Sequence, residues 1–311
     1  METRRIGSLE ASVIGLGCNN FGMKLDAAES AEVVNAALDA GITYFDTADL
    51  YGSGQSEVFL GQALAGRRDE AVIATKFGHP NCTPEGERGA SASWIRRKVD
   101  ESLTALAIDR IDHYQLHMPD DQTEIAETLG ALHELVTEGK VAELGCSNFS
   151  AEQLDEAASV ATAGDLSAFL TCQNHYSLLT RDPETTGVLD ACERNGVGFV
   201  PFFPLESGLL TGKYAKGAEL PENSRLKLWG KRAGMFIDDD RLDIVADLTA
   251  FAAGQGHTVL ELAMSWLASN PRVTTVIAGA TTPDQVAANV GAAGWSLTPD
   301  ERAEVDRICT T

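Results

Sequence analysis

The sequence lacks a long apolar run. No hydrophobic segment approaches the roughly 20 residues that a helix needs to cross a bilayer. Residues 1–5 carry charge and no apolar stretch follows them, so we expect no signal peptide. These two absences predict a soluble, cytoplasmic protein.

Positive charge is also scarce. The 24 lysines and arginines face 46 aspartates and glutamates, which leaves a formal net charge of −22 at pH 7. Such a chain would repel nucleic acids and anionic membranes, so we expect neither as a partner. An anionic cofactor would need a local cluster of donors to overcome this field. The composition makes no prediction of the oligomeric state.

Three local signals are missing as well. The cysteines show neither a CxxC pair nor a zinc-site spacing, so we expect reduced thiols and no metal. No GxGxxG turn follows a strand near the N-terminus, which argues against a Rossmann dinucleotide site. No linker rich in Pro, Gly or Ser divides the chain, and we expect one domain over 1–311. The cysteines are Cys18, Cys82, Cys146, Cys172, Cys192 and Cys309.

The chain does contain a long alternation of strand and helix patterns. Amphipathic helical segments such as 27–39 separate eight β-rich ones, and Ser150 and Thr282 are typical helix N-caps. Parallel strands need helical crossovers, so this alternation predicts a parallel α/β sheet. The predicted strands are 13–16, 43–46, 71–76, 111–116, 142–145, 170–173, 198–202 and 275–278.

Eight such units can close into a (β/α)8 TIM barrel, whose active site lies at the carboxyl ends of the strands. An open, doubly wound sheet is the alternative architecture. We expect residues 4–12 to form a short N-terminal β-hairpin cap at the bottom of the barrel. The connections 78–93 and 212–240 are unusually long, which is typical of functional loops.

Four polar side chains fall at or just after predicted strand ends. Asp46 ends the second strand and Tyr51 follows it. Lys76 ends the third strand, and His117 comes directly after the fourth. Each residue alone has an ordinary structural explanation, such as a helix cap or a solvated rim side chain. Because strand ends of a barrel meet at one mouth, their joint placement favours a catalytic site.

These groups suit the reduction of a carbonyl by hydride. A tyrosine is a poor acid near neutral pH because its pKa is about 10. We expect the Lys76 ammonium to lower the pKa of Tyr51, and Asp46 to keep that lysine charged and oriented. His117 can donate a hydrogen bond to the carbonyl oxygen, which Tyr51 can then protonate.

Together with Phe45-Asp46-Thr47-Ala48 and Gln115-Leu116-His117, these residues resemble the catalytic tetrad of the aldo-keto reductases. The similarity runs from Arg4 to the last helices. It is close to the bacterial branch that includes the β-subunits of voltage-gated potassium channels. The resemblance implies a (β/α)8 barrel, a nicotinamide cofactor and a small-molecule carbonyl substrate, with Tyr51 as the general acid.

The resemblance also implies which residues hold the nicotinamide. Ser147, Asn148 and Gln173 match the residues that bind its carboxamide, and an amide side chain suits this group because it offers donor and acceptor. Phe202 stands where an aromatic ring stacks on the nicotinamide, usually Tyr or Trp. The next position, commonly Ser, is Phe203. Further implied cofactor contacts are Cys18, Asn19, Asp46, Pro204 and Leu205.

The remainder of the cofactor maps onto two later stretches. Residues 205–214 resemble the loop that closes over the pyrophosphate. Residues 279–289 resemble the site for adenine and the 2′-phosphate, although this stretch contains no basic residue. We expect NADPH, with NADH as the alternative. The implied contacts are Ser207, Gly208, Lys213 and Arg225 for the phosphates, and Gly279, Thr281, Gln285 and Asn289 for the adenosine end.

The sequence does not name the substrate. Asn19 stands where aromatic residues or Met are common in the family, which indicates a more polar pocket. Two other functions stay open. A strand-end lysine equally fits a Schiff-base aldolase or lyase with Lys76 as the nucleophile. The resemblance to channel β-subunits also allows a cofactor-binding regulatory protein. The expected substrate-lining residues are Asn20, Phe21, His79 and Trp229.

Overall fold

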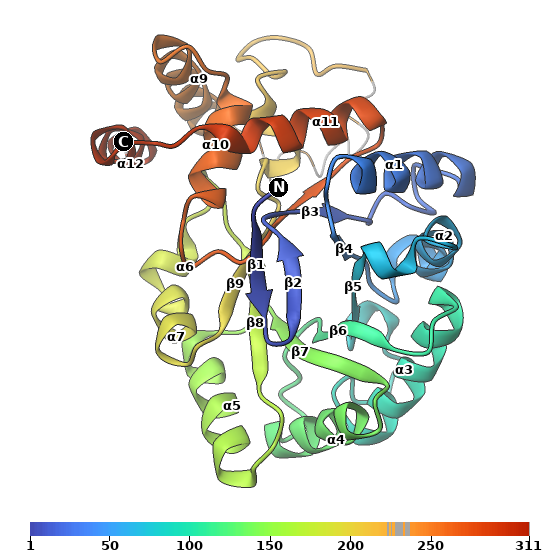
Figure 1. Cartoon of the computed structure of the whole chain (residues 1–311). Coiled ribbons are helices and arrows are strands. Elements are labelled where there is room, and N and C mark those ends of the chain that lie inside the picture. The colour runs from blue at the N-terminus through green and yellow to red at the C-terminus, as the bar shows by residue number, and fades with distance from the viewer. Residues whose placement is uncertain (223, 225, 228–232, 234–236, 311) are drawn as a thin grey trace.

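The computed structural model describes residues 1–222, 224, 226–227, 233 and 237–310. Eight parallel strands form a barrel that helices surround (Figure 1). Each strand lies within two residues of a segment predicted from the sequence. The strands are β3 (Ile14–Gly17), β4 (Tyr44–Asp46), β5 (Val72–Phe77), β6 (Ile111–Leu116), β7 (Val141–Ser147), β8 (Phe169–His175), β9 (Gly198–Phe202) and β10 (Val276–Gly279).

The sheet closes on itself. Its strand order is β10-β3-β4-β5-β6-β7-β8-β9, so each strand from β3 to β9 pairs with the next in sequence. The last gap is bridged just before β10. There the Phe199 N–H donates to the carbonyl of Arg272 at 3.0 Å, and the Thr274 N–H donates to the carbonyl of Phe199 at 2.7 Å. The closed barrel is confirmed, and the open doubly wound alternative is wrong.

The helices follow the predicted alternation. Helix α1 spans the predicted residues, and both predicted N-caps are confirmed. The Ser150 and Thr282 hydroxyls each accept a hydrogen bond from the backbone N–H three residues on, at 3.3 Å. The described helices are α1 (Ala27–Asp39), α2 (Gln55–Ala63), α3 (Ala92–Leu106), α4 (Ile125–Thr137), α5 (Ala151–Gly164), α6 (Asp182–Thr185), α7 (Val188–Arg194), α9 (Asp239–Gly254), α10 (Val259–Ala268), α11 (Pro283–Gly291) and α12 (Pro299–Cys309).

An N-terminal hairpin covers the bottom of the barrel, as predicted. Strands β1 (Thr3–Ile6) and β2 (Leu9–Ser12) pair antiparallel and lie across the barrel in Figure 1. Ile6 and Ala11 pack into the same buried cluster as Tyr44, Val200 and Ile277 from the barrel strands. Because the hairpin fills this end, ligand access is left to the carboxyl ends of the strands.

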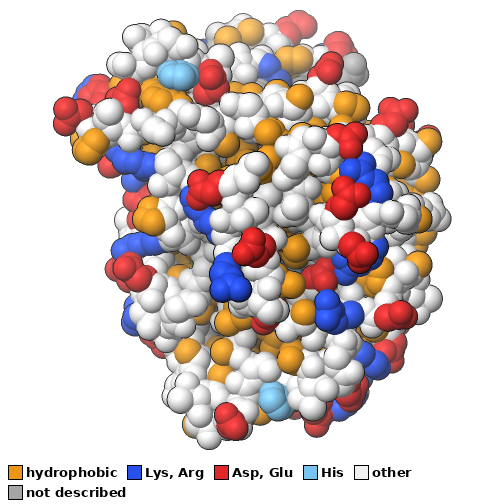
Figure 2. Space-filling model, viewed as in Figure 1, with side chains coloured by type: hydrophobic (Ala, Val, Ile, Leu, Met, Phe, Trp, Pro, Cys, Tyr) orange, Lys and Arg blue, Asp and Glu red, His pale blue; other side chains and the backbone are white. Residues whose placement is uncertain are grey.

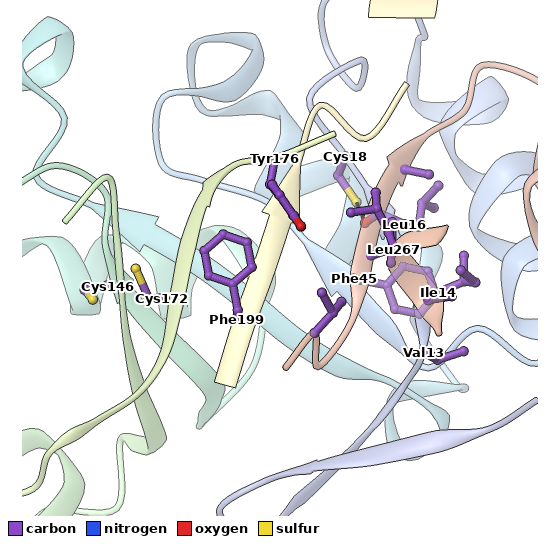
Figure 3. Close-up of a cluster of buried hydrophobic side chains, with 14 of the residues drawn as sticks. Val13, Ile14, Leu16, Cys18, Phe45, Cys146, Cys172, Tyr176, Phe199 and Leu267 are labelled. Atoms are coloured by element: carbon purple, nitrogen blue, oxygen red, sulfur yellow. Dashed lines mark hydrogen bonds between the residues drawn. The ribbon is translucent and has the colours of Figure 1, made fainter. Parts of the chain in front are cut away.

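The larger apolar core lies between the strands and the helices. Alternate side chains of a strand point to opposite faces, so Ile14 and Leu16 of β3 pack outward against the helical layer. Figure 3 shows them with Phe45 and Phe199, which are fully buried in the same cluster. No helix in the described part of the chain combines the length and apolar character that a membrane span requires.

Candidate active site

A cavity of about 660 Å³ opens at the carboxyl ends of the barrel strands. Its wall includes the last residue of β3, β4, β7, β9 and β10, and His117 directly after β6. The structure therefore brings most of the predicted positions together. Those that line it are Asn19, Asn20, Asp46, Tyr51, His79, His117, Ser147, Asn148, Gln173, Phe202, Pro204, Leu205, Ser207, Gly208, Lys213, Gly279, Thr281, Gln285 and Asn289.

An ion pair is buried beneath this cavity. The ammonium of Lys76 donates to Asp46 Oδ2 at 2.6 Å and to the carbonyl of Thr47 at 3.0 Å. The other carboxylate oxygen, Asp46 Oδ1, accepts from the side-chain amides of Gln115 and Gln173, at 3.2 and 3.0 Å. A buried ion pair needs such extra partners to offset its desolvation.

The charge on Lys76 is held by this pairing. Burial alone would lower the pKa of the fully buried Lys76. The Asp46 carboxylate and the Tyr51 hydroxyl act the other way, and the net pKa of Lys76 is raised. The lysine is therefore an ammonium under all ordinary conditions, and not a free amine.

Tyr51 lies directly above this lysine, at the start of the short helix η1 (Tyr51–Gly54). The Lys76 nitrogen is 5.3 Å from the centroid of the Tyr51 ring. The structure corrects one expectation here. The ammonium does act to lower the pKa of Tyr51, but burial acts more strongly, and the net pKa is raised. Tyr51 is thus protonated at neutral pH, as a proton donor must be.

Two histidines complete this end of the cavity. The rings of His117 and Tyr51 meet edge to face with centroids 6.0 Å apart, and those of His79 and His117 do so at 4.9 Å. Burial, with the nearby Lys76 and His79, lowers the pKa of His117 to about 2, so its ring is neutral. Among the described residues, no hydrogen-bond partner faces the buried Nδ1 of His117. A buried N–H without a partner is costly, which favours the proton on Nε2.

Polar groups at the ends of β7 and β8 form a linked set. The Ser147 hydroxyl donates to the carbonyl of Gln173 at 2.7 Å. The Asn148 amide donates to Ser147 Oγ and to the carbonyl of His117, both at 3.0 Å. Asn148 has a positive φ of 62°, a backbone conformation that Asn tolerates better than most residues. The set is therefore fixed in place at the cavity wall beside the ion pair.

Two phenylalanines follow at the end of β9. Phe202 and Phe203 both line the cavity, with ring centroids 5.3 Å apart in an edge-to-face arrangement. His175, the last residue of β8, stacks on Phe202 with centroids 5.4 Å apart and planes at 17°. No role was predicted for His175, because its neighbours come from elements far along the chain.

The loop after β9 carries features that suit an anion. Ser207 and Gly208, in the short helix η4 (Glu206–Thr211), line the cavity. The buried Ser207 hydroxyl has no hydrogen-bond partner among the described residues. Gly208 has a φ of 100°, and a Cβ placed there would come within 2.7 Å of the Lys213 ammonium. A side chain at 208 would thus fill the space beneath this cation.

Two predicted contacts among the described residues do not lie in the cavity wall. Cys18 and Phe21 are fully buried among the apolar core side chains instead. Figure 3 shows Cys18 among the core side chains. Neither of these two side chains lines the cavity. Arg225 and Trp229 lie outside the described residues.

Several residues of the wall were not assigned from the sequence. Met118 adjoins His117 and could have been found from that neighbourhood. Leu260 belongs to α10, whose approach to the cavity depends on how that helix packs on η4, and the sequence contains no signal for it. The unassigned lining residues are Gly17, Lys24, Met118, Phe203, Thr211, Leu260, Ile277, Ala278 and Ala288.

The described His, Cys, Asp and Glu side chains nowhere form a group of three or more able to hold a metal ion. All six cysteines are free thiols. The reactive groups of the cavity are therefore a protonated tyrosine, a charged lysine with its carboxylate, and neutral histidines. This set can transfer a proton and stabilise negative charge on an oxygen.

Comparisons with known proteins agree with this arrangement. The model of the Aldo/keto reductase family matches residues 13–309. The chain is 36% identical over 277 residues to a probable voltage-gated potassium channel subunit beta of Oryza sativa subsp. japonica, which covers 88% of this chain and 84% of that protein. It is 33% identical over 311 residues to the L-glyceraldehyde 3-phosphate reductase of Escherichia coli (strain K12), covering 96% and 88%.

A solved structure extends the agreement to three dimensions. The glycerol dehydrogenase AKR11B4 from Gluconobacter oxydans matches with a TM-score of 0.83 and 31% identity, over 98% of this chain and 94% of that one. The family match covers the whole barrel, and the named relatives include a reductase and a dehydrogenase. This chain belongs to the aldo/keto reductase family and is an NAD(P)H-dependent oxidoreductase.

Proposed function

We propose that this chain reduces an aldehyde or ketone to an alcohol with NADPH, and that Tyr51 is the general acid. The observation that carries the proposal is the position of Tyr51. Its ring lies over the buried Lys76–Asp46 pair and beside the neutral His117, in the wall of the cavity. A carbonyl oxygen placed between Tyr51 and His117 would meet two proton-bearing groups.

The reduced nicotinamide, when bound, supplies hydride to the carbonyl carbon. The chain's own residues manage the charge that develops on oxygen. His117 donates a hydrogen bond from Nε2 and orients the carbonyl. Tyr51 gives its hydroxyl proton to the oxygen. Lys76 stabilises the phenolate that remains, and Asp46 keeps Lys76 charged and in position.

The polar groups along the cavity support a dinucleotide. Ser147, Asn148 and Gln173 offer amide and hydroxyl groups at one end, and Phe202 offers a ring face beside them. Ser207 and Lys213 offer a hydroxyl and a cation farther along. These groups match in kind what a carboxamide, a nicotinamide ring and a pyrophosphate need.

The preference for NADPH over NADH rests on the adenosine end. Helix α11 begins there at Pro283 with Thr282 as its N-cap, and a helix N-terminus favours an anion such as the 2′-phosphate. Against this stands the stretch 279–289, which has no Lys or Arg. Thr281 donates from its N–H and its hydroxyl to Gln285 Oε1, at 2.9 and 3.1 Å. NADH therefore stays the alternative cofactor.

We further propose that the substrate is small and polar, with an oxygen on the carbon next to the carbonyl. His79 Nδ1 accepts a hydrogen bond from the Asn81 N–H at 3.1 Å, which places the ring proton of the neutral His79 on Nε2. Since the rings of His79 and His117 adjoin, two N–H donors serve one part of the cavity. Asn19 and Asn20 add polar groups nearby. The names of two relatives, the L-glyceraldehyde 3-phosphate reductase and the glycerol dehydrogenase, support this class.

The two alternative functions are less well supported. A Schiff-base nucleophile must be an uncharged amine. The raised pKa and full burial of Lys76 both oppose that role. A protonated tyrosine placed over this lysine favours an enzyme over a purely regulatory protein.

A direct test begins with titrations of NADPH and NADH, followed by a carbonyl panel with the tighter cofactor. We expect glycolaldehyde to be reduced with a higher kcat/KM than propanal. Tyr51→Phe should lower kcat at least about 100-fold while cofactor affinity changes less than about twofold. Unchanged turnover in the variant would contradict the role of Tyr51 as the general acid. A higher kcat/KM for propanal would contradict the proposed substrate class.

A further inference from the structure

The carboxylate of Glu206 is fully buried where three elements meet. Its Oε1 accepts hydrogen bonds from His175 Nε2 at 2.7 Å and from the Ser177 hydroxyl at 2.5 Å. Its Oε2 accepts from the Arg241 guanidinium at 3.2 Å. These donors come from the end of β8, the turn after it and the first turn of α9. Glu206 itself begins η4, so one carboxylate joins all of these segments.

The backbone around Glu206 is strained. Glu206, Ser207 and Gly208 are three consecutive residues with positive φ, of 45°, 56° and 100°. Glycine tolerates this region, whereas Glu and Ser adopt it at an energetic cost. Such a turn persists only if the surroundings hold it, and the buried hydrogen bonds of Glu206 supply that restraint.

One part of the hydrogen-bond network around Glu206 supports the Phe202 ring in the cavity wall. His175, which donates to Glu206, stacks on Phe202 with planes at 17° and meets Phe203 edge to face at 5.6 Å. Because Glu206 fixes the His175 ring, it also fixes the back of Phe202. The opposite side of Phe202 remains to face the cavity that it lines.

The other part of the network holds the segment of the loop after β9 that suits an anion. The residue after Glu206 is Ser207, whose buried hydroxyl has no partner among the described residues. Gly208 follows and lies against the Lys213 ammonium. A hydroxyl left without a partner in a cavity wall indicates a ligand that would satisfy it.

We propose that Glu206 is a positioning residue that fixes the ring platform and the phosphate cradle of the cofactor site together. The ring platform is Phe202 backed by His175, and the phosphate cradle is Ser207, Gly208 and Lys213. This inference rests on the proposed use of a nicotinamide dinucleotide. Glu206 acts through these residues and does not itself line the cavity.

Two variants separate the effect on the ring platform from the effect on the phosphate cradle. Glu206→Gln keeps the shape of the side chain, but it removes the charge and turns one acceptor into a donor that faces other donors. It should raise the Kd of NADPH, and that of 2′-phospho-ADP-ribose, which lacks the nicotinamide, by about tenfold or more. His175→Ala should raise the Kd of NADPH severalfold, because the ring platform is lost. It should leave the Kd of 2′-phospho-ADP-ribose within about twofold of the wild-type value, because the phosphate cradle is kept. Isothermal titration calorimetry measures both constants without turnover.

Asp112→Asn is the matched control. Asp112 is also a buried carboxylate with an arginine partner, since Arg68 donates to its Oδ2 at 2.6 Å. It lies near the start of β6, at the end of the barrel away from the cavity. Its variant should lose thermal stability and keep both Kd values within about twofold, as expected for sites without shared partners.

The outcomes distinguish the inference from the function on which it rests. If the wild-type chain binds and the Glu206→Gln variant binds both ligands equally well, Glu206 is not a positioning residue. The positioning role is also overturned if Asp112→Asn weakens binding as much, because the effect is then one of general stability. A wild-type chain that binds neither NADPH nor NADH would overturn the proposed function and this inference with it.

Discussion

Ionisable residues in this barrel show how burial and partners compete. Burial favours the neutral form of any such group. It lowers the pKa of His117 to about 2 and raises that of Glu57 to about 6. Lys76 is buried as deeply, yet its pKa is raised, which favours the charged form, because Asp46 lies 2.6 Å away. A neutral hydrogen-bond donor and a fixed positive charge therefore coexist within one site.

At this scale we predict a pH-dependent contribution to stability from Glu57. It accepts a hydrogen bond from the Thr75 hydroxyl at 2.6 Å, and its pKa rises from 4.5 to about 6 on burial. The folded chain therefore holds the carboxyl proton of Glu57 more tightly than the unfolded chain does. The stabilisation is therefore complete below pH 4.5 and is lost as the pH rises through about 6.

Glu57→Gln should remove this dependence. From about pH 4 to pH 7, the unfolding free energy of the wild type should fall by about 2 kcal/mol relative to the variant. Urea unfolding across this range measures the difference. A difference that stays flat with pH would show that Glu57 titrates normally in the folded chain.

Among the elements, β7 shows how tightly the barrel interior is filled. The fully buried His113 of β6 is linked to the Tyr44 hydroxyl at 2.8 Å and to the Thr171 hydroxyl at 3.0 Å. Gly145 of β7 passes beside this chain of hydrogen bonds. A Cβ at 145 would lie 2.5 Å from both His113 Nε2 and Thr171 Oγ1. The strand therefore needs glycine here for lack of space.

We predict that Gly145→Ala destabilises the fold by about 3 kcal/mol, because it overpacks the interior and breaks buried hydrogen bonds. Gly130→Ala, in α4, is the control. No atom lies within 4 Å of a Cβ placed at 130, so this change should stabilise the chain by about 0.5 to 1 kcal/mol. Thermal unfolding of both variants compares them, and equal melting temperatures would contradict the clash at 145.

For the whole molecule, the dominant property is its net charge of −22. On the face seen in Figure 2, acidic and basic side chains are interspersed and form no basic patch. A negatively charged cofactor must therefore approach against the overall field. Lys213, in the cavity wall, supplies a positive charge where the phosphates are expected.

Lys213→Ala should raise the Kd of NADPH about tenfold at low salt and change kcat at saturating cofactor less than about twofold. The loss should shrink as the ionic strength rises toward about 0.5 M, because salt screens the missing charge. Lys216→Ala is the matched control, since that exposed lysine of the same loop pairs with Asp243 at 2.6 Å and is absent from the cavity wall. Fluorescence titration at several salt concentrations measures the Kd of NADPH for both variants. Equal increases in Kd would assign the loss to the change in net charge and not to the position of Lys213.

Local patterns in the sequence were enough to predict the fold. The period of two in strands and of 3.6 in helices depends only on neighbouring residues, so the eight strands, helix α1 and the caps at Ser150 and Thr282 could all be predicted. The same patterns placed Asp46, Tyr51, Lys76 and His117 at strand ends. Barrel topology brings those ends together, so the catalytic part of the site followed from these patterns, whereas most other predicted residues of the cavity wall came from the resemblance to the aldo-keto reductases.

Other properties depended on contacts between distant segments. The net direction of the Tyr51 pKa depends on the balance between burial at the barrel mouth and the charges of Lys76 and Asp46, which belong to β5 and β4. The burial of Cys18 and Phe21 in the apolar core depends on how side chains from distant segments pack around them. Glu206 meets His175 across 31 positions of sequence, through the register of β8 and the loop after β9. The sequence alone therefore determined which groups stand at the barrel mouth, whereas only barrel closure and side-chain packing decided their protonation and their partners.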